Sequence, residues 1–303
     1  MERASYIEVP CRSAINAVKG MPFRWSINPY RGCRHRCVYC FARQYQAWHE
    51  LDSGLDFENK IFVKTNLPDV LRDELRKPSW RHERVVVGTA TDCYQPAEGR
   101  YRLTRRTLEA LRDHHNPTEI ITKGTMILRD IDVLAELARR ADCSVNISVT
   151  TVDDDLWKKL EPGTPRPRKR LEVMRELVRA GVNAGVLMAP CIPGITTQRG
   201  VIERVLEAAA QHEARYVCHG LLRLAPGTRE WYLGFVQREY PQLYEGYLRL
   251  YSRGAHASAE YEQKVAGRVA EARAVHLVSS GRRTTAAPAL QPGLFDRLGV
   301  RGE

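Results

Sequence analysis

The sequence predicts an α/β fold, an open partial TIM barrel of six strand–helix units, (βα)6, followed by a C-terminal helical extension. Two observations carry this prediction. Short β-branched runs alternate with amphipathic stretches between residues 24 and 226, and aromatic residues at helical spacing replace them after Gly227. Repeated βα units imply a parallel sheet with right-handed crossovers. Six units favour an open barrel over a doubly wound sheet, and in either fold reactive groups belong at the carboxyl ends of the strands.

Each predicted strand is short and rich in β-branched residues, and each predicted helix carries its apolar residues on one face. Asp130 is placed to cap one of these helices, and Pro190 is expected to stop one strand. In chain order, the predicted strands are 24–28, 84–88, 118–123, 143–151, 182–189 and 215–224. The predicted helices of the barrel are 102–115, 130–140, 168–180 and 197–212, with an extra strand at 61–64 and a helix at 67–76.

Beyond the barrel, the stretch 231–253 is rich in Trp, Tyr and Phe and predicts two helices broken at Pro241. One more helix is predicted over 257–277, before a stretch of Gly, Arg, Thr, Ala and Pro. The expected organisation is therefore an N-terminal segment 1–23, a core domain 24–226, a helical extension 227–278 and a disordered tail 279–303.

The composition is that of an ordinary globular protein, with 43% hydrophobic and 27% charged residues. No apolar run reaches the roughly 18–20 residues that a membrane span needs, and the N-terminus does not read as a signal peptide. We therefore expect a cytoplasmic protein with no membrane partner. The 47 Lys and Arg against 36 Asp and Glu give a net charge of +11, which favours a polyanionic partner over a merely solvated basic surface.

Three of the eight cysteines, Cys33, Cys37 and Cys40, follow the spacing C-x3-C-x2-C. Three thiolates on one loop can hold three irons of a four-iron four-sulfur cluster and leave the fourth iron open to a small molecule. A structural zinc site is the alternative, but it usually needs two separated ligand pairs. His35 could complete a zinc site only with strain, because it lies inside the same loop. Buried structural cysteines are the remaining alternative.

The residues around these cysteines resemble the radical S-adenosylmethionine (SAM) superfamily, and within it the branch related to spore photoproduct lyase. Tyr39, the aromatic residue before the last cysteine, is typical of the superfamily. The resemblance extends over residues 24–225. The segments that carry it are 28–33, 39–43, 91–98, 121–124, 148–151, 161–165 and 189–194.

This resemblance implies two cofactors, a four-iron four-sulfur cluster on Cys33, Cys37 and Cys40, and SAM at the open iron. One electron then cleaves SAM to methionine and a 5′-deoxyadenosyl radical, with flavodoxin or ferredoxin as the reductant. The resemblance also implies roles for residues near the strand ends. They are Tyr39 against the adenine, Thr89, Thr91 and Asp92 toward the amino group of SAM, Lys123 toward its carboxylate, Ser148 toward its carboxylate or ribose, and Cys93 as a hydrogen donor.

The substrate is left open between three hypotheses. Spore photoproduct lyase acts on a DNA lesion, so the basic charge favours a radical SAM enzyme that repairs or modifies nucleic acid. A radical SAM enzyme acting on a peptide or small metabolite is the second hypothesis, and a non-enzymatic iron–sulfur or zinc nucleic-acid-binding protein is the third. The tail segment Gln291-Pro292-Gly293-Leu294-Phe295 resembles the pentapeptides that dock on the bacterial sliding clamp, which would be a further partner.

Overall fold

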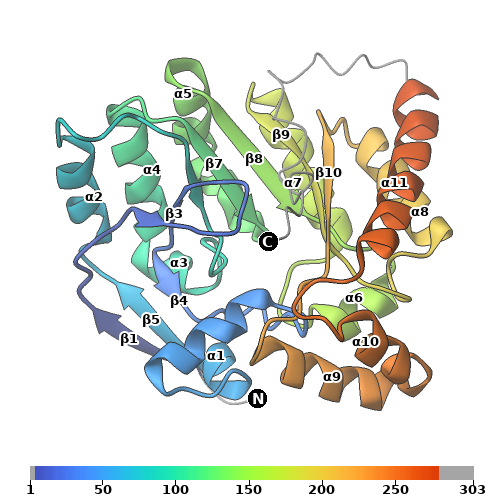
Figure 1. The fold of residues 1–303 in the computed structure, drawn as a ribbon. Helices are drawn as coiled ribbons and strands as arrows, with labels where there is room; N and C mark the ends of the chain where they lie inside the picture. The colour runs from blue at the N-terminus through green and yellow to red at the C-terminus, as the bar shows by residue number, and fades with distance from the viewer. Residues whose placement is uncertain (1–3, 280–303) are drawn as a thin grey trace.

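The structure is a computed structural model that describes residues 4–279. Its central element is a seven-stranded sheet curled into an open barrel (Figure 1). Six of its strands are parallel and follow the order of the chain, while β2 (Asn16–Ala17) pairs antiparallel with β3 at one edge. The parallel strands are β3 (Trp25–Ile27), β6 (Val85–Val87), β7 (Thr118–Thr122), β8 (Cys143–Ser148), β9 (Asn183–Cys191) and β10 (Val217–Leu221). The predicted open (βα)6 barrel is confirmed.

Helices cover the outer face of this sheet. They are α2 (Leu67–Leu75), α4 (Leu103–Asp113), α5 (Ile131–Arg140), α7 (Pro167–Arg179) and α8 (Arg199–Gln211). Strand residues alternate between two environments, as the two-residue period of a strand requires. In β8, Val145 and Ile147 join the apolar core shared with the helices, whereas Asn146 faces the other side and donates a 2.6 Å hydrogen bond to Glu119. The barrel interior is therefore lined partly by polar side chains.

A second, three-stranded sheet lies beside the carboxyl ends of the barrel strands (Figure 1). Its strands are β1 (Ser5–Val9), β5 (Lys60–Lys64) and β4 (Tyr30–Arg31). The extra strand predicted at 61–64 is confirmed as β5, but the sequence did not predict β1, which pairs with β5 in parallel. β5, the partner of β1, lies about 55 residues further along the chain, so no local sequence pattern predicts this pairing. Strand β4 leads directly into the cysteine loop, which we define as residues 32–40.

The C-terminal helices close the lower side of the barrel in Figure 1. Helix α9 (Thr228–Glu239), the turn η3 (Pro241–Leu243) and α10 (Tyr244–Leu250) confirm two helices broken at Pro241. Helix α11 (Ala259–Ser279) packs against α8 and β10. No helix among residues 4–279 is long and apolar enough to span a membrane. The predicted tail beyond Ser279, including Gln291–Phe295, lies outside the described residues.

Five short elements connect these layers. They are η1 (Phe41–His49), α1 (Leu55–Asn59), α3 (Ala97–Tyr101), η2 (Thr125–Asp130) and α6 (Asp154–Leu160). All but η1 precede or follow a strand of one of the two sheets, and η1 follows the cysteine loop. Together they carry much of the backbone that surrounds the carboxyl ends of the barrel.

Two local predictions were wrong. Pro190 does not stop strand β9, which continues to Cys191. The pairing of β9 with β10 shifts register between His219 and Leu221, and such an irregularity tolerates a residue without a backbone N–H. Asp130 precedes α5 but makes no capping hydrogen bond. Its buried carboxylate instead accepts hydrogen bonds from Tyr94, Arg105 and Arg129. A buried carboxylate near two guanidinium groups is better satisfied by them than by backbone N–H groups.

Tyr251, the residue directly after α10, holds the end of this helix to the barrel, and its hydrogen bond predicts a measurable contribution to stability. Tyr251 is fully buried and its hydroxyl donates a 2.7 Å hydrogen bond to the carbonyl of Leu222. Tyr251→Phe leaves that carbonyl without its donor, so we expect a loss of about 1–3 kcal/mol in the free energy of unfolding. Chemical denaturation measures it. Tyr244→Phe is the control, because no hydrogen bond of the Tyr244 hydroxyl is found among residues 4–279, and an equal loss in both variants would refute the assignment.

Candidate functional site

The three predicted ligand cysteines lie on the cysteine loop, between β4 and η1. Cys33 and Cys37 are each only 6% exposed, and Cys40 is partly buried. Burial raises the pKa of Cys37 to about 12 and also raises the pKa of Cys33 and Cys40. After burial, the nearby charges of Asp92, Cys40 and Cys37 raise the pKa of Cys33 further, so the three thiols influence one another. Three soft ligands on one enclosed loop fit a four-iron cluster that leaves one iron open.

His35, the fourth ligand of the zinc alternative, is turned away from this role. Its Nδ1 lies 3.1 Å from a carboxylate oxygen of Asp92, and both side chains are buried. The same oxygen of Asp92 accepts a 2.7 Å hydrogen bond from the backbone N–H of Lys123. His35 therefore links the cysteine loop to the ends of β6 and β7, and this contact disfavours the zinc site.

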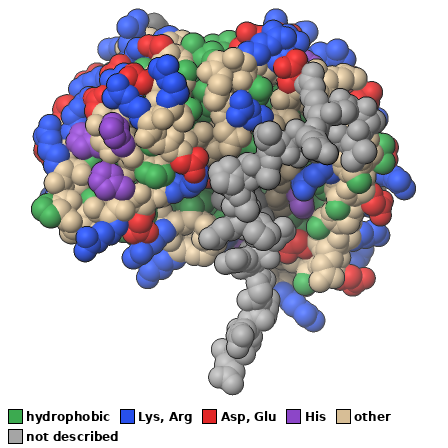
Figure 2. Space-filling model, turned by 90° about the horizontal axis from the view of Figure 1, so that it is seen from above, with side chains coloured by type: hydrophobic (Ala, Val, Ile, Leu, Met, Phe, Trp, Pro, Cys, Tyr) green, Lys and Arg blue, Asp and Glu red, His purple; other side chains and the backbone are tan. Residues whose placement is uncertain are grey.

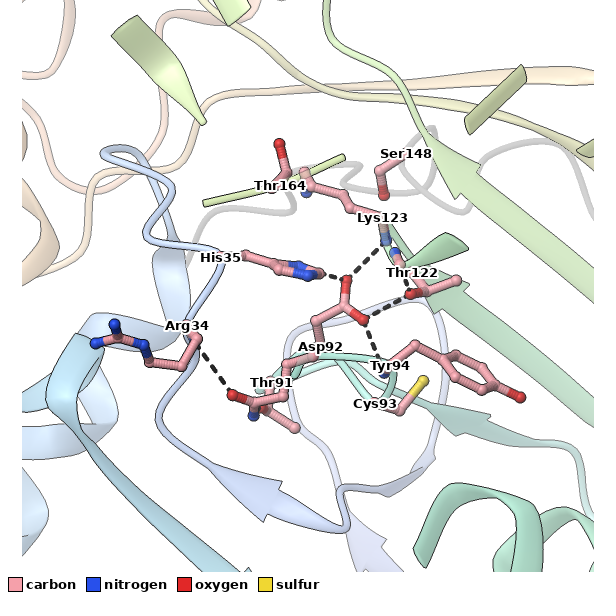
Figure 3. Close-up of polar contacts among 12 residues, drawn as sticks. Arg34, His35, Thr91, Asp92, Cys93, Tyr94, Thr122, Lys123, Ser148 and Thr164 are labelled. Atoms are coloured by element: carbon pink, nitrogen blue, oxygen red, sulfur yellow. Dashed lines mark hydrogen bonds and ion pairs between the residues drawn. The ribbon is translucent and has the colours of Figure 1, made fainter. Parts of the chain in front are cut away.

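Asp92 lies at the centre of this connection (Figure 3). Its second carboxylate oxygen accepts a 2.6 Å hydrogen bond from the Thr122 hydroxyl and a 2.9 Å bond from the backbone N–H of Tyr94. Burial alone would raise the pKa of Asp92, but His35 and these hydrogen bonds hold it well below its usual range. Both oxygens of Asp92 are thus already engaged by the protein, which weakens its predicted role as an acceptor for SAM.

The first turn of the cysteine loop is held by the segment after β6. The carbonyl of Gly32 accepts hydrogen bonds from the Thr91 hydroxyl at 2.7 Å and from the Gln95 amide at 3.0 Å. The Gln95 carbonyl oxygen accepts a 3.1 Å bond from the backbone N–H of Arg34. Gly32 has a φ of +79°, and a Cβ there would lie 2.6 Å from the carbonyl oxygen of Lys60, so only glycine fits this turn. Thr91 and Gln95 therefore position the loop.

The far side of the loop is held by α6 and the segment after it. The N–H of Val38 donates a 3.0 Å bond to the carbonyl of Leu160, and the N–H of Gly163 donates a 3.1 Å bond to the carbonyl of His35. A Cβ on Gly163 would lie 2.3 Å from the carbonyl oxygen of Arg34. The two backbones therefore approach as closely as they can.

Two buried arginines complete the support. Arg43 is fully buried, donates to the Cys37 carbonyl at 3.0 Å and pairs with Glu58 at 2.6 Å. Arg170, also buried, donates to the Ser148 carbonyl at 2.9 Å and pairs with Glu161. Each guanidinium therefore joins the loop or a strand end to a carboxylate, as the fork of five donors allows.

Glu161 connects Arg170 to Tyr39. Its buried carboxylate accepts hydrogen bonds from the hydroxyls of Tyr39 and Thr150, the latter at 2.8 Å. Burial would raise the pKa of Glu161, but Arg170, Lys123 and the Tyr39 hydroxyl hold it at about 2. Glu161 is thus ionised at neutral pH. Its hydrogen bond holds the side chain of Tyr39, which lies between Cys37 and Cys40 in the chain.

Lys123 and Ser148 lie next to each other at the ends of β7 and β8, as the register of the two strands requires (Figure 3). The Lys123 ammonium is 5.7 Å from the centre of the Tyr39 ring. Burial opposes its charge, but Cys37 and Glu161 raise its pKa overall. Among residues 4–279, no carboxylate lies within 4 Å of this ammonium and the Ser148 hydroxyl makes no hydrogen bond. Both groups are therefore available to a ligand.

Of the two remaining predicted residues, Thr89 is partly exposed and Cys93 is buried. Thr89 exchanges weak hydrogen bonds of 3.3 and 3.5 Å with the side chain of Asn28. Cys93 is fully buried in the core between barrel and helices, with its sulfur 3.9 Å from the carbonyl of Ile121. Its role as a hydrogen donor stays a prediction, and this burial argues against it.

Several supporting residues were missed by the sequence. Arg43 and Arg170 look like ordinary basic residues until the fold buries them. Glu161 and Gln95 lie inside segments that the sequence had singled out, but nothing in their spacing assigned a partner. The one usable signal was the position of both segments after predicted strands.

An open parallel barrel with three thiols on the loop that follows its first strand defines a class of iron–sulfur enzyme. The family model described as the radical SAM superfamily matches residues 27–205, and the chain belongs to this superfamily. Members bind a four-iron four-sulfur cluster and SAM, which are therefore the cofactors of this enzyme.

The chain is also similar to individual relatives and to a solved structure. The chain is 39% identical over 269 residues to an uncharacterized protein of Mycobacterium tuberculosis, covering 88% of this chain and 79% of that protein. It is 27% identical to the Radical SAM Nalpha-GlyT isomerase of a Pseudomonas phage, over 61% of this chain and 37% of that protein. The fold is similar to spore photoproduct lyase complexed with dinucleoside spore photoproduct, with a TM-score of 0.68 at 14% identity, covering 89% and 79% of the two chains.

The contact between Gly163 and the cysteine loop predicts that the loop does not tolerate a side chain there. Gly163→Ala must push the carbonyl of Arg34 away, so we expect a lower thermal midpoint and less iron retained after anaerobic reconstitution. Gly267→Ala is the matched control, because nothing lies within 4 Å of its added Cβ. Equal iron content in Gly163→Ala and the control would show that this backbone approach does not position the ligands.

Proposed function

We propose that this radical SAM enzyme holds its cluster through Cys33, Cys37 and Cys40 and acts on nucleic acid. The observation that carries the cluster assignment is a single, largely enclosed loop that presents three thiols near the ammonium of Lys123, which has no carboxylate within 4 Å among residues 4–279. When bound, the cluster and SAM supply one-electron cleavage of a C–S bond to a 5′-deoxyadenosyl radical. The protein positions the cofactors and excludes water from them.

In this proposal Lys123 and Ser148 bind the carboxylate of SAM, and Tyr39 packs against its adenine. A partly buried ammonium with no carboxylate within 4 Å in the described part of the chain favours binding of an anionic group, and the neighbouring hydroxyl adds a donor. We assign Thr91 and Asp92 to holding the cysteine loop, because their polar atoms are engaged there. Thr89 remains a candidate for the amino group of SAM.

Water exclusion falls to the apolar residues that surround the loop. Cys37 and Tyr39 belong to one apolar cluster with Leu160 of α6, Tyr232 of α9 and Tyr247 of α10. The Thr228 hydroxyl, at the start of α9, donates to the carbonyl of Cys40 at 3.2 Å. The C-terminal helices thus cover one side of the loop, and a radical formed there would be shielded from solvent.

Support for a nucleic acid substrate comes from the net charge of the chain and from a solved structure with a similar fold. The net charge is +11, and polyanions bind such a surface by releasing counterions. Spore photoproduct lyase, which has the same fold, was solved with a dinucleoside in its complex. A reductant such as flavodoxin or ferredoxin completes the proposed reaction. Docking on a sliding clamp through residues 291–295 stays a prediction from the sequence.

The cluster assignment predicts the iron content of cysteine variants. The reconstituted enzyme should hold about four irons per chain and, with dithionite, convert SAM to 5′-deoxyadenosine. Replacing Cys33, Cys37 or Cys40 by Ala should abolish both, because each supplies the only protein ligand to one iron. Cys218→Ala serves as the control and should keep both. A cysteine-loop variant with full iron content would move the ligands elsewhere.

The proposed role of Lys123 predicts weaker SAM binding with an intact cluster. Loss of a charge-assisted contact costs about 10- to 150-fold in affinity, so Lys123→Ala should raise the dissociation constant of SAM by that factor. Titration of the reconstituted enzyme with SAM measures it. Lys158→Ala, on the exposed surface of α6, is the control and should bind as the wild type does. Unchanged affinity in Lys123→Ala would remove this residue from the cofactor site.

A further inference from the structure

The outer face of the small sheet gathers positive charge beside the cysteine loop. Along β5 the side chains alternate: Ile61 and Val63 are fully buried, whereas Lys60, Phe62 and Lys64 face outward and are partly exposed. Arg31 of β4 pairs with Phe62 across the two strands, so its side chain lies on the same face. We call the set of Arg31, Lys60, Phe62 and Lys64 the cationic face.

Within the described residues, two of these cations, Arg31 and Lys64, have no carboxylate partner. The guanidinium carbon of Arg31 lies 3.8 Å from the centre of the Phe62 ring. Its Nε is buried and has no hydrogen-bond partner among residues 4–279. In the same described part of the chain, no carboxylate lies within 4 Å of Arg31 or Lys64, whereas Lys60 pairs with Asp56 at 2.9 Å.

The charges of Arg31 and Lys64 also act on one another and on a neighbour. Burial lowers the pKa of Lys64; the nearby Cys11 acts in the opposite direction, and the positive charge of Arg31 lowers the pKa again. At the end of η1, burial and then Arg31 and Lys64 lower the pKa of His49. Positive charges held close together without counterions are unfavourable, so this face is stabilised when an anion binds to it.

The shape of the cationic face indicates which kind of anion fits. It is an open strand surface, and Lys60 and Lys64 are about 13 Å apart along it at the usual rise of a strand. A small phosphorylated metabolite would instead need an enclosed pocket. Cations that follow a strand beside an aromatic ring are the combination that binds single-stranded nucleic acid, and a guanidinium plane can also stack on a base.

The position of the cationic face, close to the cysteine loop, also supports single-stranded nucleic acid as its partner. Arg31 directly precedes Gly32 and Cys33 in the chain. The small sheet lies at the same end of the molecule as α6 and α9 (Figure 1). The carboxyl ends of the barrel strands, with Lys123 and Ser148, are at this end too. By contrast, the amino-end face shows Lys and Arg mixed with Asp and Glu (Figure 2).

We propose that the cationic face binds the phosphodiester backbone of a single-stranded nucleic acid and holds it beside the mouth of the barrel. This inference rests on the proposed action on nucleic acid and names the surface that would receive it. Arg31 and Lys64 each contact a phosphate, and the strand extends from there toward the cysteine loop.

The test compares two pairs of substitutions with the same loss of charge. One is Arg31→Gln with Lys64→Gln. The control is Arg81→Gln with Arg139→Gln, exposed residues before β6 and β8, at the opposite end of the barrel. Binding of fluorescently labelled single-stranded DNA and RNA is measured with the full-length reconstituted enzyme between about 50 and 200 mM salt. Iron content is measured on each variant, and Lys64→Glu alone gives a second variant on β5, outside the cysteine loop.

The cationic-face pair should bind about tenfold more weakly at low salt. Its salt slope should fall by about 1.4, since each single-strand phosphate contact contributes about 0.7. The control pair should bind like the wild type, and Lys64→Glu should weaken binding with full iron content.

Three outcomes would overturn the inference in different ways. If wild-type enzyme binds oligonucleotides and both pairs weaken binding equally or not at all, the cationic face is refuted while the nucleic acid substrate stands. If wild-type enzyme binds neither DNA nor RNA but still forms 5′-deoxyadenosine from SAM, the nucleic acid substrate and the face fail together. If it binds vesicles of anionic phospholipid through Arg31 and Lys64 and no oligonucleotide, the face belongs to a lipid surface instead.

Discussion

The cysteine loop cannot satisfy its own backbone, and the rest of the structure supplies what it lacks. Residues 32–40 form neither helix nor strand, so their buried N–H and carbonyl groups need partners from elsewhere. Those partners come from the segment after β6, from α6, from Arg43 and from the start of α9. The loop therefore takes its shape only when the barrel and its C-terminal helices have assembled around it.

Buried carboxylates surround this loop in a regular way. Asp92, Glu161 and Glu58 each face a cationic or imidazole partner: His35, Arg170 and Arg43 respectively. Such buried pairs add little net stability, because desolvation offsets much of their attraction, but they favour one geometry over its alternatives. With these carboxylates engaged, the ammonium of Lys123 is left for an incoming anion. The electrostatic arrangement thus separates structural charges from the charge offered to a ligand.

The order and type of the barrel elements could be predicted from the sequence because strands such as 85–87 and helices such as 103–113 carry local periodic signals. The three cysteines proposed as cluster ligands were equally visible, since their spacing is itself the signal. Strand β1 and the partners of Asp92 and Glu161 were not, because each depends on residues far apart in the chain. Asp92 is an example. From the sequence, a carboxylate at a strand end can either bind a ligand or bond to the protein itself. Only the folded positions of His35, Thr122 and Lys123 show that Asp92 bonds to the protein.

The contact between Thr228 and the carbonyl of Cys40 joins two residues separated by 188 positions. During synthesis the cysteines emerge from the ribosome long before α9 and α10 exist. For that interval the loop lacks one of the groups that hold its backbone in the folded structure. Arrival of the C-terminal helices then encloses the loop. The long separation in sequence thus means that this side of the loop is enclosed only after every strand of the barrel has been synthesised.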